Sequence, residues 1–129
     1  GARTGGLQTS TLAVGLADAA ITLLEVESQQ RPALADPAHA MRDEWMQLRI
    51  DLLKLASGDQ VCSNEVLRTR ANSHVLRATQ AALAAAKGAG YVVGHPAGQW
   101  CREALFFLVW SCPQPVMAAN LCELAGISE

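Results

Sequence analysis

The stretch Ala84–Ala104, AAAKGAGYVVGHPAGQWCREA, decides how the fold of this chain is interpreted. A helical segment rich in alanine stops at Gly88 and Gly90, and a new helix begins at Pro96 after a short turn. Proline suits the first helical position because its missing N–H has no intrahelical partner there. Glycine at a helix end permits a positive φ and lets another chain or a phosphate come close. We therefore expect a tight helix–turn–helix corner with exposed backbone.

Apolar residues recur at helical spacing on both sides of this corner, and no strand pattern is present in the sequence. The clearest stripe consists of Met41, Trp45, Leu48, Leu52 and Leu55. The predicted helices cover residues 4–27, 37–57, 64–87, 96–110 and 116–125, with Asp36 as the N-cap of the second and Gly126 ending the last. The sequence thus predicts an all-α fold, an up-and-down four-helix bundle with a short fifth C-terminal helix.

Size, charge and cysteine content narrow the class of protein. The 129 residues are enough for a single domain, residues 1–129, with its own core. The formal net charge of -2 argues against a nucleic-acid-binding protein and against a polybasic membrane anchor. No uninterrupted apolar run approaches the roughly 18 residues that span a bilayer, and no signal peptide is recognised. We therefore expect a cytoplasmic protein without a membrane partner. The cysteines fit no zinc pattern and are expected to be reduced thiols: Cys62, Cys101, Cys112 and Cys122.

Charge is unevenly distributed along the chain. Between Val66 and Arg102 no acidic residue occurs, and the basic residues there are Arg68, Arg70, Arg77, Lys87 and Arg102. Two interpretations stay open. These side chains form a solvated face that is paired with the acidic helices before them, or they form a face that meets a polyanion. A dinucleotide pyrophosphate or a coenzyme A phosphate is a polyanion of the second kind.

The corner also resembles the signature of a known family. The segments Lys87–Tyr91, Pro96 and Arg102–Ala104 are similar, with the same spacing, to the GG-x-GY…P…RDA corner in the C-terminal domain of acyl-CoA dehydrogenases. In that family the turn touches the adenine-dinucleotide half of an FAD that is bound mainly by a neighbouring subunit. The resemblance therefore implies that Gly88 and Gly90 lie against this cofactor.

Two cationic residues stand at positions that the resemblance assigns to the cofactor. Lys87 replaces the first glycine of the family corner, and Ala84 replaces a glutamine that hydrogen-bonds the cofactor. Arg31 aligns with the arginine of an Arg-x-Thr-Phe-Gly segment that holds the FAD pyrophosphate, although Ala33 replaces its threonine. The cofactor-binding residues implied by the resemblance are Arg31, Lys87, Gly88 and Gly90. The alternatives are a solvent-exposed loop arginine and an ordinary glycine helix stop.

No catalytic residue is predicted in this chain. In many family members a glutamate within Tyr-Glu-Gly-Thr removes the substrate α-proton while hydride passes to the flavin. Counting from Arg102, that glutamate position holds Ser111, which cannot serve as this base unaided. Some relatives use a glutamate at the start of the first helix, and Ala2–Thr4 offers none. Either the base comes from a missing domain, or the chain is a diverged member with altered or no activity, so we expect this chain alone to be inactive.

The other polar candidates are expected to be structural. Arg102 and Glu103 match the Arg-Asp pair of the signature, and we expect Arg102 to hold the corner through backbone carbonyls or a carboxylate. We expect His95 to cap the helix that begins at Pro96. No metal site is expected from the histidines, which are far apart in the sequence: His39, His74 and His95.

The resemblance implies a function for a longer flavoprotein of which this chain is one domain. The chain would complete the FAD and substrate sites, and the full protein would oxidise an acyl-CoA thioester at its α,β bond, with electrons passing to an electron-transfer flavoprotein. The apolar run Leu105–Trp110 suits a homo-oligomer interface. Two alternatives remain, a non-catalytic helical assembly domain that has lost flavin binding and a flavin monooxygenase on the same fold.

Overall fold

The computed structural model describes the backbone of residues 2–127 and the side chains of residues 7–127. In this range the chain is all-α, as predicted, and contains no strand. The helices are α1 (Ala2–Ser28), α2 (Ala35–Ala56), α3 (Asn64–Ala86), α4 (Pro96–Leu105) and α5 (Gln114–Ala125). Short 3₁₀ turns occur at Pro32–Leu34, Lys87–Tyr91 and Phe106–Leu108.

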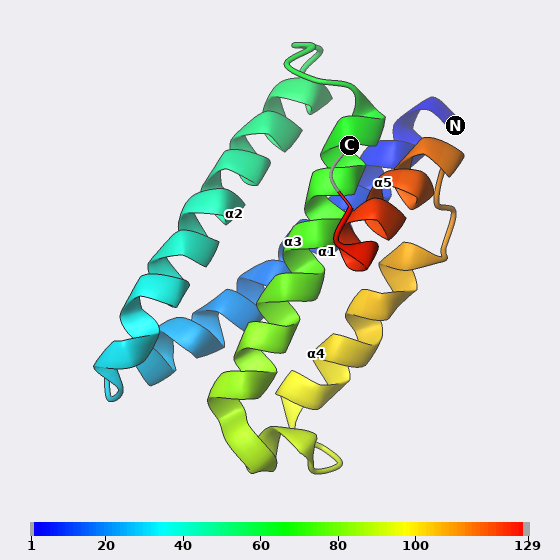
Figure 1. Cartoon of the computed structure of the whole chain (residues 1–129). Helices are drawn as coiled ribbons and strands as arrows, with labels where there is room; N and C mark the ends of the chain where they lie inside the picture. The colour runs from blue at the N-terminus through cyan, green and yellow to red at the C-terminus, as the bar shows by residue number, and fades with distance from the viewer. Residues whose placement is uncertain (1, 128–129) are drawn as a thin grey trace.

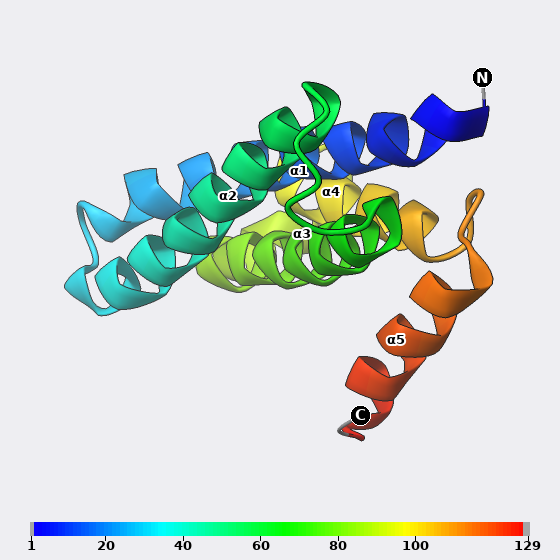
Figure 2. The same ribbon diagram turned by 90° about the horizontal axis from the view of Figure 1, so that it is seen from above.

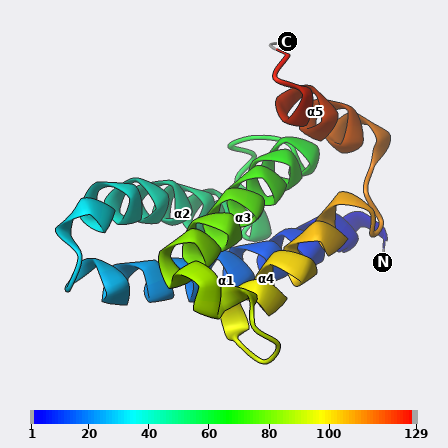
Figure 3. The ribbon, with the colours of Figure 1, turned by 60° about the horizontal axis from the view of Figure 1, so that its bottom comes forward.

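Helix α3 is the centre of the structure and packs against all four other helices. Helices α2 and α4 lie on opposite sides of it, and α1 runs behind it (Figure 1). Helix α5 projects away from the layer formed by the other helices (Figures 2 and 3). Its only extensive contact with another α-helix is its contact with α3. The buried contact of α1 with α3 therefore forms the core, and α5 is attached at one end of it.

Small residues allow α1 and α3 to pack closely. Alanines with no more than 1 % exposure belong to one buried cluster from both helices: Ala13, Ala17 and Ala20 on α1, and Ala71, Ala78 and Ala82 on α3. The distance between two helix axes depends on the side chains at the contact, and alanine keeps it short. Helix α2 is tied to the same core by Trp45, whose indole N–H donates to the Val14 carbonyl at 2.9 Å.

Arg68 lies in the interior, with only 2 % of its surface exposed. Its Nη2 donates to the carbonyls of Phe107 and Trp110 at 3.0 and 2.9 Å, and its Nη1 donates to that of Ser111 at 3.3 Å. Burial lowers the pKa of this guanidinium, yet arginine stays charged at neutral pH. The three carbonyls lie where the α4 segment ends, and the negative end of a helix dipole stabilises a cation there.

Helix α4 is shorter than predicted. The sequence predicts a helix from Pro96 to Trp110, but the α-helix ends at Leu105 and continues only as the 3₁₀ turn Phe106–Leu108. The apolar run continues the helical pattern, so nothing local marks the end. Beyond this 3₁₀ turn Arg68 bonds the carbonyls of Phe107 and Trp110, and the chain then turns at Ser111, where φ is +45°.

Two predicted helix starts are also corrected. Asp36 does not cap α2, because a 3₁₀ turn that begins at Pro32 leads directly into the helix and places Asp36 within its first turn. Helix α5 begins at Gln114 and not at Val116, since Pro115 is accommodated in the first turn, where its missing N–H costs nothing. The predicted stop at Gly126 is confirmed, with φ +74° at the C-cap.

One segment of α1 has the length and composition of a membrane span. Leu7–Ser28 comprises 22 residues with a mean hydropathy of 1.4. The sequence analysis did not single it out because Asp18 and Glu25 interrupt the apolar run. In the structure 44 % of this segment's most apolar stretch is buried inside the protein, and the core helix of a soluble protein passes the same test.

The buried guanidinium gives the first prediction. Replacing Arg68 by methionine removes the donor to the Trp110 and Ser111 carbonyls and to Asn72 Oδ1, whereas the Phe107 carbonyl keeps the donor on Asn72. We expect the free energy of unfolding to fall by about 3 kcal/mol. The matched control is Arg70→Met on the same helix, because Arg70 forms a partly exposed ion pair with Asp51 at 2.8 Å. That variant should lose about 1 kcal/mol or less. Urea unfolding followed by circular dichroism measures both, and equal losses would contradict the assigned role of Arg68.

Candidate functional site

The predicted corner between α3 and α4 is present. Helix α3 ends at Ala86, the 3₁₀ turn Lys87–Tyr91 follows, and α4 begins at Pro96. The predicted cap is confirmed, because Nδ1 of His95 accepts the backbone N–H of Ala97 at 3.1 Å. The corner therefore has a fixed geometry at both of its ends.

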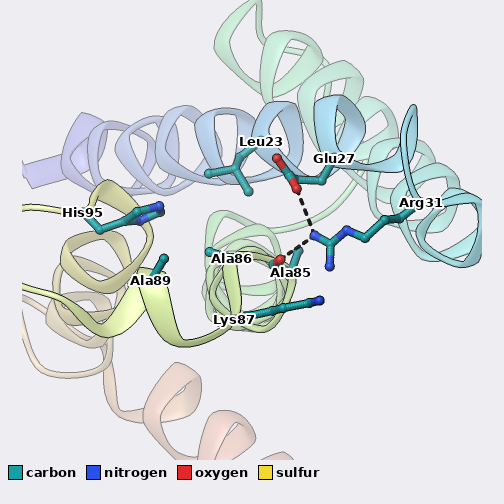
Figure 4. Close-up of a pocket in the computed structure, with 8 residues that line it drawn as sticks. All are labelled: Leu23, Glu27, Arg31, Ala85, Ala86, Lys87, Ala89 and His95. Atoms are coloured by element: carbon teal, nitrogen blue, oxygen red, sulfur yellow. Dashed lines mark hydrogen bonds and ion pairs between the residues drawn. The ribbon is translucent and has the colours of Figure 1, made fainter.

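A pocket of about 380 Å³ lies between this corner and the end of α1. Its walls come from segments that are distant in the sequence (Figure 4): Leu23 and Glu27 from α1, Arg31 from the loop after it, Ala85 and Ala86 from α3, and Lys87, Ala89 and His95 from the corner. The two cationic residues that the sequence analysis singled out, Arg31 and Lys87, thus line the same pocket. In Figure 4 their side chains extend toward each other.

Arg31 has one structural role that the sequence analysis did not anticipate. Its Nη2 donates to Glu27 Oε1 at 2.9 Å and to the backbone carbonyl of Ala85, in the last turn of α3. The guanidinium carries five N–H donors, and within the described residues only Nη2 is used. The Nε and Nη1 donors remain available to a ligand in the pocket. Arg31 is therefore a partly engaged side chain and not a free loop arginine.

Lys87 adopts a backbone conformation that normally belongs to glycine. Its φ is +58° and its ψ is −148°. A residue with a side chain pays roughly 1–3 kcal/mol for such a conformation, and the family that the corner resembles has glycine here. The side chain is exposed and forms no ion pair with any described residue. A strained position that keeps a free cation beside a pocket points to a role in binding.

The two predicted glycines do not line the pocket. Gly90 is buried, and a Cβ there would lie 2.8 Å from that of Ala86. A Cβ on Gly98, which the sequence analysis did not single out, would lie 2.6 Å from the carbonyl oxygen of Gly90. Gly88 has no such neighbour within 4 Å and is exposed. Close packing of the corner on its own helices therefore accounts for Gly90 and Gly98.

Two further residues were assigned by the resemblance, Arg102 to the support of the corner and Ser111 to the position of the catalytic base. Arg102 is exposed and makes no hydrogen bond or ion pair with a described residue, so it does not hold the corner. Arg31, in the loop after α1, instead contacts the end of α3 by donating to the Ala85 carbonyl. Ser111 is exposed beyond the other end of α4 and does not line the pocket. The side chains of Ala2–Thr4 lie outside the described residues.

Most of the remaining basic residues after Val66 are paired or buried. Arg70 and Arg77 form ion pairs with Asp51 and Glu44, both on α2. The interpretation as a face paired with acidic helices thus holds for these two residues, whereas Arg68 belongs to the interior. Like the buried Arg68, Lys87 and Arg102 have no ionic partner among the described residues, and of these three Lys87 alone lines the pocket beside Arg31.

The histidines are in three separate environments. His39 is exposed on α2, and His74 is buried between α2 and α3, where its Nε2 lies 3.0 Å from the Met41 carbonyl. Burial lowers the pKa of the His74 imidazole, so it is neutral at pH 7 and Nε2 donates this bond. Among the described residues no group of three or more histidine, cysteine or acidic side chains is placed to hold a metal ion.

A second hollow, about 480 Å³, lies between α1 and α4 and is mainly apolar. It is lined by Leu12, Leu16, Arg102, Glu103, Phe106 and Phe107. Leu12 and Phe106 remain 64 % and 44 % exposed, and the Phe106 ring stacks on Trp110 at 5.2 Å. The predicted apolar run therefore leaves large side chains on the surface.

A comparison of the chain with protein-family models, with curated proteins and with solved structures found no match. The likeness to acyl-CoA dehydrogenases consequently rests on the corner residues and on Arg31.

The packing of the corner gives the second prediction. Gly98→Ala places a methyl group against the Gly90 carbonyl, and we expect it to lower the free energy of unfolding by roughly 1–3 kcal/mol. Gly88→Ala is the matched control, because its new Cβ meets open space. That variant should change stability by less than about 1 kcal/mol and in the stabilising direction. Thermal and urea unfolding measure both, and equal stability of the two variants would contradict the close contact.

Proposed function

We propose that this chain is the C-terminal all-α domain of an acyl-CoA dehydrogenase-like, FAD-dependent oxidoreductase, with α1–α4 as an up-and-down bundle and α5 as its short fifth helix. In the longer protein it would complete the FAD site and the homo-oligomer interface in the cytoplasm. The full enzyme would oxidise an acyl-CoA thioester at its α,β bond and pass electrons to an electron-transfer flavoprotein. The observation that supports this proposal is the convergence of Arg31 and Lys87 on one pocket.

The donors around the pocket suit a pyrophosphate. Arg31 keeps free guanidinium donors, whose planar arrangement matches two phosphate oxygens. Lys87 offers a point charge on a flexible stem, which is the other common phosphate partner. Glu27 offsets one of these charges through its ion pair with Arg31. The net charge of the three side chains Glu27, Arg31 and Lys87 is therefore +1. A doubly charged diphosphate would be attracted, and an uncharged ligand would gain nothing from these groups.

The same residues do not support catalysis by this chain alone. FAD, when bound, would accept the hydride, and a carboxylate would have to take the α-proton. Ser111 supplies no carboxylate at the position that the resemblance assigns to this base. The role proposed for the chain is therefore to bind and position the dinucleotide part of the cofactor, with the base provided by another part of the protein.

A second candidate function is a non-catalytic assembly domain. The observation that favours it is the exposed apolar surface at the end of α4, where Leu105, Phe106, Val109 and Trp110 are 56, 44, 78 and 56 % exposed. Large contiguous apolar surfaces of this kind mark interaction sites. Such a domain would associate without any flavin.

The third prediction tests the proposed function directly. The full gene product, purified with added FAD, should show the flavin absorption band, and an acyl-CoA should bleach it in the absence of oxygen. Arg31→Met should weaken FAD binding about tenfold, because a charge-assisted hydrogen bond to phosphate is lost. Lys54→Met, which removes an exposed cation at the end of α2, is the control and should bind FAD normally. A colourless and stable oligomer would contradict the proposal and support the assembly domain.

The fourth prediction uses the strained backbone of Lys87. Lys87→Gly should raise the free energy of unfolding by about 1 kcal/mol, because glycine accepts this φ and ψ without strain. The same change should weaken FAD binding roughly tenfold through the lost charge. Ala89→Gly, a pocket residue without positive φ, is the matched control. It should lose stability and keep its affinity for FAD, and a stable Lys87→Gly variant with unchanged affinity would contradict a binding role for Lys87.

A further inference from the structure

The cap of α4 determines where the imidazole proton of His95 lies. Nδ1 accepts the Ala97 N–H at 3.1 Å, so this nitrogen must carry a lone pair. A neutral imidazole has one donor and one acceptor nitrogen. The proton is therefore on Nε2, and the helix cap fixes the tautomer.

The same ring reaches the pocket. His95 is half-buried and lines the pocket together with Arg31 and Lys87. In Figure 4 its imidazole extends from the start of α4 toward the pocket, between Leu23 and Ala89. Within the described residues Nδ1 has a hydrogen-bond partner and Nε2 has none. Nδ1 thus caps α4, and the N–H on Nε2 has no hydrogen-bond acceptor among the described residues.

Capping alone does not explain a histidine at this position. Asn, Asp, Ser and Thr are the residues that cap helix N-termini best, and any of them would supply the acceptor for the Ala97 N–H. Histidine supplies the same acceptor and adds a donor on the far side of a rigid ring. This second property has a place to act, because the ring lines the pocket.

We infer that His95 is a third ligand-binding residue of the pocket, donating its Nε2–H to a phosphate oxygen of the ligand that Arg31 and Lys87 attract. The inference rests on the proposed function, since it names a further residue of the same dinucleotide site. The ligand class is a diphosphate, either inorganic or the pyrophosphate of a dinucleotide. Arg31 and Lys87 provide the charge at one side of the pocket, and His95 offers a hydrogen-bond donor from the opposite side.

The fifth prediction separates the two roles of His95. His95→Asn keeps an acceptor for the Ala97 N–H but has no group at the position of Nε2. We expect its stability to equal that of the wild type and its affinity for inorganic pyrophosphate to fall at least about tenfold, as for one hydrogen bond to a charged acceptor. Isothermal titration with pyrophosphate and with ADP should give the same factor, because the donor contacts phosphate. His39→Asn, at an exposed site on α2, is the control and should bind as the wild type does.

A spectroscopic readout tests the tautomer without relying on affinity. Long-range ¹H–¹⁵N spectra of the histidine rings should show the Nε2–H form for His95, and pyrophosphate should shift this signal and leave that of His39 in place. A His95 proton on Nδ1 would overturn the inference, whatever the titrations show.

The remaining outcomes distinguish failure of the inference from failure of the proposed function. If Arg31→Met and Lys87→Met weaken pyrophosphate binding while His95→Asn binds normally, the inference about His95 is wrong and the phosphate site stands. If the wild-type chain does not bind pyrophosphate, or if none of the three variants changes the affinity, both the inference and the proposed site are wrong.

Discussion

The close approach of the Gly90 carbonyl to Gly98 constrains the position of α4, and the pocket depends on that position because His95, at the start of α4, lines it. A Cβ on Gly98 would lie only 2.6 Å from this oxygen, so the turn can fold back on the first turn of α4 only because Gly98 lacks a side chain. A Cβ on Gly90 would instead meet that of Ala86 on α3. This return places His95 at the wall of the pocket. It also leaves the end of α3 open to Arg31, which binds the Ala85 carbonyl from the other side. The site therefore follows from backbone packing before any ligand is considered.

The opposite end of α4 is fixed by a different means. There Arg68 donates to the carbonyls of Phe107 and Trp110, and Asn72 donates to Asn120 at 2.9 Å, which attaches α5 to α3. Removing this buried cation is costly, because the Trp110 and Ser111 carbonyls and Asn72 Oδ1 would lose a donor. Helix α4 is thus held at its N-terminal end by the close packing of Gly98 on Gly90, and at its C-terminal end by the hydrogen bonds of the Arg68 guanidinium. The site at its N-terminal end can then keep its shape without a ligand.

Local signals in the sequence predicted most of the fold. Prolines and glycines marked the corner and the last helix, and the stripe on α2 predicted its buried side. The end of α4 was missed because the apolar run continues the helical periodicity through Trp110. The contacts of Arg68 with this segment join residues far apart in the chain and leave no signal in that periodicity. For the site, the resemblance singled out Arg31 and Lys87. The ion pair of Arg31 with Glu27 follows i,i+4 spacing, so that signal was in the sequence and was not used. The contact of Gly98 with Gly90 had no local signal at all.

The conformation of Lys87 distinguishes a binding site from a simple bend. A bend would be most stable with glycine at φ +58°, ψ −148°, as in the family that the corner resembles, and the neighbouring Gly88 and Gly90 show that glycine is used freely in this turn. A lysine there carries a backbone penalty of roughly 1–3 kcal/mol, which no contact of its side chain with the described residues offsets. Arg31, by contrast, is stabilised by the fold through Glu27 and the Ala85 carbonyl. The pocket therefore contains one cation, Arg31, whose side chain is held by hydrogen bonds within the fold, and a second, Lys87, whose backbone is strained. A bound phosphate is the kind of partner that would compensate the second.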